Sequence, residues 1–207
     1  MTLIDISPVL DAGVAVWPGD TPFARNVSLD IDAGAHLTLS DVRTTLHAGA
    51  HADAPSHYAA GGADIASRSL DYYIGQCIVV HVNVERGDRI RPMHIAGKAI
   101  TAPRVLFRTG TFPDPRNWND DFASLSPAVI DVLHQHGVIL VGIDTPSVDP
   151  FESKALESHQ ALAEHDMANL EGLVLDGVAE GAYELIAAPL RIRGGDASPV
   201  RALLRTI

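Results

Sequence analysis

The chain contains a single cysteine among its 207 residues, and this residue, Cys77, lies in the apolar stretch 74–80. One cysteine excludes a disulfide within the chain. A thiol surrounded by apolar residues is more typical of an inert core position than of a nucleophile. The sequence therefore predicts neither a disulfide-stabilised scaffold nor cysteine-based catalysis.

Basic charge is scarce as well. The sequence has 15 Lys and Arg against 26 Asp and Glu, a net charge of -11, and its C-terminal arginines are separated by apolar residues as on the solvated faces of strands. Nucleic-acid binding requires a basic face, so this function class is excluded. No apolar run reaches the roughly 20 residues that cross a bilayer, and no basic-then-apolar leader is visible. We therefore expect a cytoplasmic protein with no nucleic-acid or membrane partner.

Linkers, repeats and low-complexity tracts are also lacking, which predicts one α/β domain over residues 1–207. Strands are expected at 3–7, 78–84, 105–108, 138–143, 173–178, 183–192 and 200–206. The clearest helix is expected at 128–136, because Ser126 can cap it, Pro127 suits its first position and Gly137 suits its end. A second helix is expected at 154–165.

Histidine, in contrast, is concentrated in one segment. Residues 47–57 read HAGAHADAPSH and hold three of the ten histidines and an aspartate among small residues. Imidazole nitrogens and carboxylate oxygens are donors that zinc prefers. The segment therefore predicts a metal site, the alternative being ordinary surface or core histidines.

The spacing within this segment adds geometry. One helical turn brings positions four apart to about 6 Å, so His47 and His51 can share an ion if the chain coils at Gly49. Pro55 disfavours the helical region for the residue before it. An extended chain over residues 51–57 would then turn His51, Asp53 and His57 to one face.

The pattern H-x-G-[TA]-H-x-D-x-P-x-H resembles the signature of the cyclase family of metal-dependent hydrolases. Ala50 stands where the broader family usually has Thr, which favours its kynurenine formamidase branch over cyclases and isatin hydrolases. The likeness extends to LIDIS at 3–7, WPGD at 17–20, GIDTPSVD at 142–149, His159, and NLE at 169–171. It implies a single swivelling β/β/α domain that forms homodimers or larger homo-oligomers.

The resemblance also implies a centre of two divalent ions, usually zinc, with manganese or another divalent ion as alternatives. The implied metal ligands are His47, His51, Asp53, His159 and Glu171, with Asp53 touching both ions and Glu171 bridging them. The residues themselves give partial support, since His159 lies in a helix-favouring stretch and Glu171 precedes the apolar run 173–175, at an expected strand entrance. On that ground alone, four nearby residues compete with His159 and Glu171 as metal ligands: Glu157, Glu164, His165 and Asp166.

Two adjacent ions make a bridging hydroxide available near neutral pH. The resemblance thereby implies hydrolysis of N-formyl-L-kynurenine to L-kynurenine and formate, in tryptophan degradation, with His57 as the acid/base that protonates the leaving nitrogen. Trp17, in a loop fixed by two prolines, is either a lid on the core or, as the resemblance favours, a wall for the substrate's aryl ring. Phe112, Trp118 and Phe151 are further possible walls.

Other functions compete with this interpretation. A serine hydrolase is disfavoured because the chain has no G-x-S-x-G elbow. Another cyclase-family hydrolase, acting on a cyclic amide or lactone such as isatin, is the nearer alternative. A binding or structural metalloprotein is the more distant one, and a closed structural zinc site would not need the additional His57.

Overall fold

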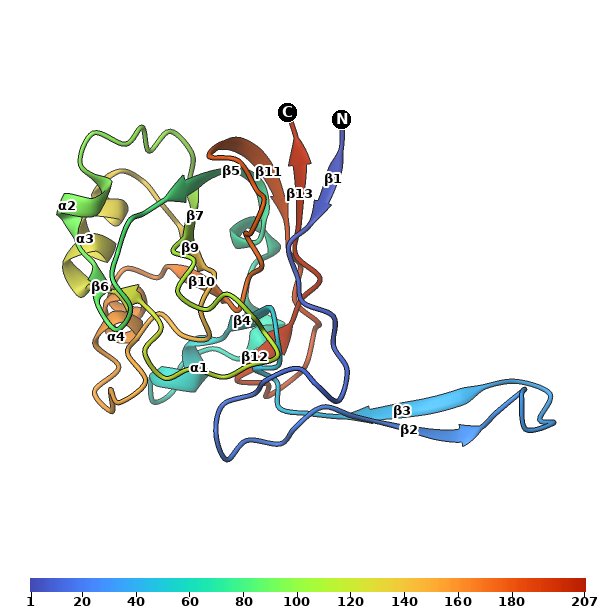
Figure 1. Ribbon diagram of the computed structural model, residues 1–207. Helices are drawn as coiled ribbons and strands as arrows, with labels where there is room; N and C mark the ends of the chain where they lie inside the picture. The colour runs from blue at the N-terminus through green and yellow to red at the C-terminus, as the bar shows by residue number, and fades with distance from the viewer.

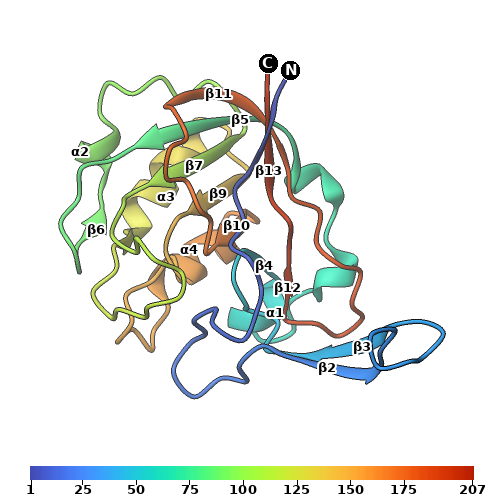
Figure 2. The same cartoon turned by 45° about the vertical axis from the view of Figure 1, so that its right-hand side comes forward.

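A nine-stranded sheet organises the molecule, with the order β1-β13-β11-β5-β7-β9-β10-β4-β12 (Figure 1). The computed structural model describes residues 1–207. In this order the strands are Leu3–Asp5, Leu203–Thr206, Gly181–Ile186, Ile74–His81, Arg104–Arg108, Leu140–Ile143, Ala168–Glu171, His51–Asp53 and Ala197–Pro199. The four central strands β5, β7, β9 and β10 run parallel, whereas the outer pairs are antiparallel. Strand β1 pairs with β13, so the two termini lie side by side (Figure 2).

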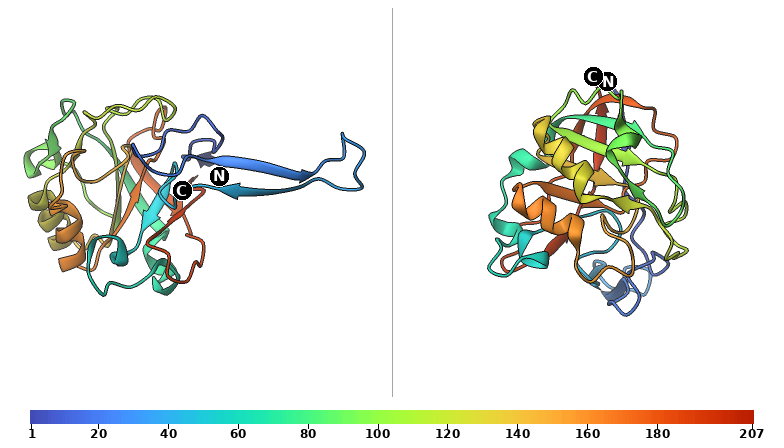
Figure 3. Two further views of the ribbon diagram at one scale, coloured as in Figure 1. Left: turned by 90° about the horizontal axis from the view of Figure 1, so that it is seen from below. Right: turned by 90° about the vertical axis from the view of Figure 1, so that its left-hand side faces the viewer.

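Two helices pack together against one face of the sheet (Figure 3). Helix α3 (Pro127–Gln135) begins and ends as predicted, because the Ser126 hydroxyl accepts from the amide of Val129 at 3.3 Å and Gly137 follows with φ +77°. Helix α4 (Glu157–Glu164) is shorter than the predicted 154–165, since Leu156 adopts a left-handed conformation before it. Shorter elements make the connections: α1 (Pro55–Tyr58), η1 (Ile65–Ser67), η2 (Leu70–Tyr72), β6 (Arg89–Ile90), α2 (Pro92–Ile95) and β8 (Ser124–Leu125).

The sheet separates two hydrophobic cores. Successive residues of the central strands alternate between them: Val79 and Leu106 join the core on one face, while Val80 and Phe107 join the core under α3 and α4. Coverage on both faces explains why these parallel strands are continuous apolar runs. Cys77 is fully buried in the first core, as the sequence predicts.

A hairpin projects from this body. Strands β2 (Ala24–Leu29) and β3 (Leu39–Arg43) pair only with each other and extend away from the sheet (Figures 1 and 3). Every residue of both strands is exposed. The sequence analysis did not predict these strands.

Several predicted strands are shorter or missing. Residues 173–178 form no strand, because the chain turns at Gly172 with φ +65° directly after β10. Leu173 and Leu175 are buried as loop residues, so the apolar run indicated burial and not a strand. The strand predicted at 183–192 ends at Ile186, and the one at 200–206 begins at Leu203. The helices of this fold lack the length and apolar character of a membrane span.

Candidate metal centre

The histidine-rich segment turns at Gly49 and then forms the short strand β4. Gly49 has φ +61°, and a Cβ there would lie 2.7 Å from the Leu10 side chain, so a larger residue would be strained and crowded. Strand β4 runs between β10 and β12. His51 and Asp53, two residues apart on this strand, therefore share one face.

Beyond Asp53 the chain departs from the prediction. Residues 51–57 were expected to remain extended, but helix α1 begins at Pro55, which suits a first helical position. The chain stays extended only as far as Ala54, which has the conformation expected before proline, with φ -100° and ψ 151°. The helical turn still brings His57 to the site, with its ring centroid 4.3 Å from that of His47.

One group of donor atoms gathers on the first carboxylate oxygen of Asp53. His47 Nδ1 lies 3.0 Å and His51 Nε2 lies 3.6 Å from Asp53 Oδ1. Together the three side chains offer donor atoms within 4.8 Å of one another. The structure thus brings together the three residues predicted for the first ion.

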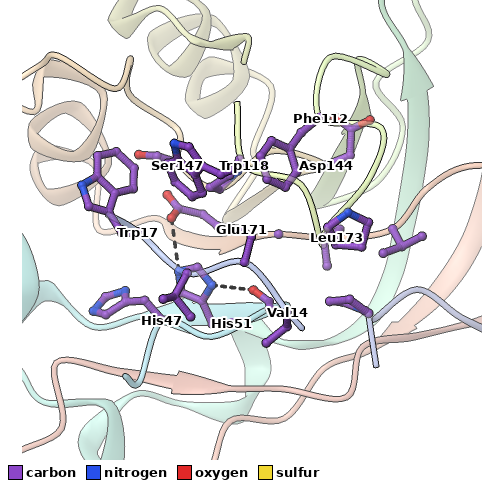
Figure 4. Close-up of a pocket in the computed structure, with 18 of the residues that line it drawn as sticks. Val14, Trp17, His47, His51, Phe112, Trp118, Asp144, Ser147, Glu171 and Leu173 are labelled. Atoms are coloured by element: carbon purple, nitrogen blue, oxygen red, sulfur yellow. Dashed lines mark hydrogen bonds and ion pairs between the residues drawn. The ribbon is translucent and has the colours of Figure 1, made fainter. Parts of the chain in front are cut away.

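A second group forms on the other oxygen of Asp53. His159 Nε2, from helix α4, lies 3.2 Å from Asp53 Oδ2 and 3.3 Å from Glu171 Oε1. Glu171 Oε2 lies 3.3 Å from His51 Nε2, a contact drawn in Figure 4. Glu171 is the last residue of β10 and lies opposite His51 of β4. The prediction that Glu171 lies at a strand entrance is therefore wrong, although Glu171 does lie beside the histidines as expected.

Each of the three histidines has one ring nitrogen held from outside the centre. His51 Nδ1 lies 2.9 Å from the carbonyl of Gly49, His159 Nδ1 lies 2.9 Å from Asp149 Oδ2, and His47 Nε2 lies 3.1 Å from Asp196 Oδ2. Such contacts fix the tautomer and ring orientation of metal-ligating histidines. The other nitrogen faces both central carboxylates in His51 and His159, and Asp53 in His47.

Unpartnered atoms test whether these residues fit a metal. His51 Nε2 and Asp53 Oδ1 are buried, and although Glu171 Oε2 and His47 Nδ1 approach them to 3.3 and 3.0 Å, neither atom makes a well-aligned hydrogen bond. Buried polar atoms are nearly always hydrogen-bonded, so two such atoms without a good hydrogen bond are typical of metal ligands. Nitrogen and carboxylate oxygen donors suit zinc and comparable divalent ions. The side chains therefore fit the expected metal.

The electrostatics favour a cation as well. Burial alone would lower the pKa of His47, but the close contacts with the Asp53 and Asp196 carboxylates outweigh it and raise the pKa to about 9. Burial likewise opposes a charged His159, yet Asp149 and Asp53 hold its pKa well above the usual value. Excess negative charge in the centre causes both shifts, and a divalent cation would neutralise it.

Three polar residues at the centre were not assigned a role from the sequence. Asn169 Nδ2 donates to Asp53 Oδ2 at 2.7 Å and to Glu171 Oε1 at 3.1 Å, and Asp149 holds His159. Both lie in stretches that resemble the family, so a signal was present. The sequence contains no such signal for Asp196, because this residue reaches the site only through the pairing of β12 with β4.

His57 lies beside the centre and not within it. Its Nδ1 is 3.7 Å from Asp196 Oδ2, and burial lowers its pKa. His57, His47 and Asp196 form a third, more exposed group whose donor atoms lie close together. His57 can therefore act either as a proton-transfer group or as a further ligand.

A cavity of about 530 Å³ opens onto the metal centre. Trp17, Phe112 and Trp118 line it together with the histidines (Figure 4). The Trp17 ring also packs with its centroid 5.3 Å from Trp118 and 5.0 Å from Phe151. The structure thus places Trp17 both on the cavity wall and in an aromatic cluster, while Phe151 supports that cluster from outside the cavity lining.

Comparison with known proteins identifies the family of this chain. The family described as "Putative cyclase" matches residues 4–150. A structure described as a potential metal-dependent hydrolase with cyclase activity is 26% identical, with 98% of this chain and 96% of that chain covered and a TM-score of 0.84. A predicted metal-dependent hydrolase from Bacillus stearothermophilus is 27% identical over 98% and 97% of the two chains, with a TM-score of 0.83.

A more distant structural match is isatin hydrolase A from Labrenzia aggregata. It is 23% identical over 98% of this chain and 93% of that chain, with a TM-score of 0.81, and this level of identity supports the fold alone. All three matches extend over nearly the whole chain. They confirm the α/β domain of the cyclase type that the sequence predicts.

Proposed function

This chain belongs to the cyclase family, and from that premise we propose that it is a metal-dependent hydrolase that converts N-formyl-L-kynurenine into L-kynurenine and formate. The observation that carries the proposal is the division of donor atoms into two groups that share Asp53, with Glu171 of the second group also 3.3 Å from His51 of the first. A closed structural site takes four ligands around one ion. Five ligands in two overlapping groups, beside a cavity and an additional histidine, are instead typical of a catalytic centre.

Two ions, zinc or another divalent metal such as manganese, would be held by five side chains. These are His47, His51, Asp53, His159 and Glu171. When bound, the ions supply an activated water and polarise the formyl carbonyl. The outer contacts of Gly49, Asp149 and Asp196 keep the three imidazoles oriented for this task.

His57 is the proton donor in the proposed reaction. In the hydrolysis a water oxygen bonds to the formyl carbon, the carbon–nitrogen bond breaks, and the aniline nitrogen must take up a proton. His57 lines the cavity, and its Nδ1 faces Asp196, so Nε2 is the nitrogen available to deliver that proton. The contact with Asp196 restrains the ring orientation.

The aromatic wall selects an aryl substrate. Trp17, Trp118 and Phe112 present ring faces and edges to the cavity, where an aryl group can pack in the offset or edge-to-face geometry that such rings prefer. The volume of about 530 Å³ lies in the range of small-molecule sites. A formyl group, the smallest acyl group, then needs little room between Trp17 and the histidines.

Isatin hydrolysis is the second candidate, because the fold matches isatin hydrolases. Formate release separates the two functions, since opening the isatin ring produces none. We expect purified protein to release one formate per N-formyl-L-kynurenine, to lose this activity in chelator and to regain it with zinc or manganese. Ring opening of isatin at a higher kcat/KM than formate release, or full activity in chelator, would overturn the proposal.

A further inference from the structure

A single fixed cation lines the cavity. Among the residues that form its wall, Arg108 is the only Lys or Arg. Its guanidinium Nη2 lies 2.9 Å from Asp176 Oδ1, and Asp176 lines the same cavity. The cavity therefore carries one fixed pair of opposite charges outside the metal centre.

Sheet geometry sets the separation of this pair from the metal ligands. Arg108 ends β7 and Glu171 ends β10, with β9 hydrogen-bonded between them in parallel register. Neighbouring strands lie about 4.8 Å apart, so roughly 10 Å separates the Cα atoms of the two residues across the carboxyl ends of the strands. This edge of a parallel sheet is also where α/β proteins bind their ligands.

The proposed substrate has matching dimensions. About seven covalent bonds separate the formyl carbon of N-formylkynurenine from its carboxylate carbon, a reach of roughly 8 Å. With the formyl group at Glu171 and the aryl ring along the aromatic wall, the α-amino-acid group extends toward Arg108. There its carboxylate and ammonium meet opposite charges.

We propose that Arg108 and Asp176 form the subsite for the α-amino-acid group of a zwitterionic aryl substrate. Arg108 donates to the carboxylate and Asp176 accepts from the ammonium. The assignment of this group as part of the substrate rests on the proposed function. A neutral lactam such as isatin has no group that uses this pair, so the subsite favours amino-acid substrates over cyclic amides.

Both side chains have capacity for these contacts. Only Nη2 of Arg108 is bound to Asp176, and a guanidinium has five donors. The side chains are 33% and 88% exposed, and both residues line the cavity, so a ligand can reach them. Asp144, the neighbouring acid, is instead buried, and its carboxylate is already occupied by Thr109 and the amide of Gly110.

Matched substrates test the subsite. The assay compares N-formyl-L-kynurenine, its analogue without the α-amino group, and formanilide, which lacks both charged groups. Arg108→Gln should raise KM about tenfold for the two carboxylates and leave formanilide within about twofold, because charge-assisted hydrogen bonds open to solvent contribute modestly. Asp176→Asn should raise KM only for N-formyl-L-kynurenine.

A matched control and a direct binding measurement complete the test. Arg86→Gln breaks a similar exposed pair, Arg86 with Asp121, outside the cavity lining and should change none of these values. Calorimetric titration with L-kynurenine should show about tenfold weaker binding to Arg108→Gln than to the parent protein. The subsite would be overturned if Arg108→Gln raised KM for formanilide as much as for N-formyl-L-kynurenine, or if it changed neither KM nor the affinity for L-kynurenine. Absence of formate release alongside weakened L-kynurenine binding would overturn the proposed reaction and leave the subsite standing.

Discussion

Asp53 and Glu171 divide their carboxylate oxygens between the same two histidines. Asp53 directs Oδ1 toward His51 Nε2 at 3.6 Å and Oδ2 toward His159 Nε2 at 3.2 Å. Glu171 places Oε2 and Oε1, respectively, 3.3 Å from the same two nitrogens. Four donor groups thus surround a common space in which two carboxylates face each other. Burial of two anions this close requires compensating positive charge.

Metal content tests this relationship. We expect about two divalent ions per chain by elemental analysis, because the five donor side chains exceed the four that one tetrahedral ion takes. Asp53→Asn should deplete both ions, since Asp53 belongs to both donor groups, whereas His47→Ala should chiefly deplete one. Active protein that contains no metal would contradict the prediction.

Trp17→Ala tests the aromatic wall. Loss of the ring should lower kcat/KM for N-formyl-L-kynurenine by about tenfold, in line with the ~0.5–1.5 kcal/mol of an aromatic pair and the apolar area lost. Because Trp17 also packs on Trp118 and Phe151, a moderate decrease in melting temperature should accompany it. Phe151→Ala is the matched control, since Phe151 belongs to the same cluster but not to the cavity lining. Normal kinetics with a large stability loss in Trp17→Ala would make the ring purely structural.

The sequence located the residues of the candidate metal centre better than the strands that carry them. His47, His51 and Asp53 follow one another at spacings that local geometry interprets, and His159 and Glu171 entered through family likeness. Asp196 could not be found in this way, because its place beside His47 depends on two distant strands pairing. The apolar run 173–175 led to the wrong prediction of a strand, because burial selects apolar residues in loops as well as in strands.

Cys77 should be inert in the folded protein. Burial raises the pKa of its thiol to about 12, so almost no reactive thiolate is present at pH 8. A thiol reagent should label the protein only at the rate of unfolding. Since the native state keeps a proton that the unfolded thiol loses above about pH 9, stability should also fall as the pH rises further. Urea unfolding of the parent protein and Cys77→Ala at pH 8 and pH 10 isolates this effect, and rapid labelling without denaturant would contradict it.

The projecting hairpin should mediate self-association. Its exposed apolar side chains are Val27, Leu29, Ile31, Leu37, Leu39 and Val42. An isolated two-stranded hairpin is marginally stable in water, so a second copy that covers it would stabilise it. Light scattering should show a homodimer or larger homo-oligomer, and replacement of residues 24–43 by a short glycine turn should give a monomer that keeps its metal. An oligomer of unchanged size after this replacement would locate the interface elsewhere.

The last prediction separates ligand from catalyst at the two ends of the histidine-rich segment. His51 lies between both central carboxylates, so His51→Ala should lose metal and activity together. His57 lies at the exposed edge of the centre, next to His47 and Asp196, with its ring centroid 5.9 Å from that of His159. His57→Ala should therefore keep its metal and its melting temperature.

The kcat of His57→Ala should nevertheless fall by about 10²- to 10⁴-fold, the usual contribution of general acid–base catalysis. The loss should shrink for formanilides with electron-withdrawing rings, whose nitrogen leaves with less help from a proton. Asp196→Asn, which changes the group that faces His57 Nδ1, should give a smaller decrease in kcat at a similar KM. Metal analysis of His51→Ala and His57→Ala decides the assignment, because equal depletion in both would make His57 a metal ligand and not the acid/base.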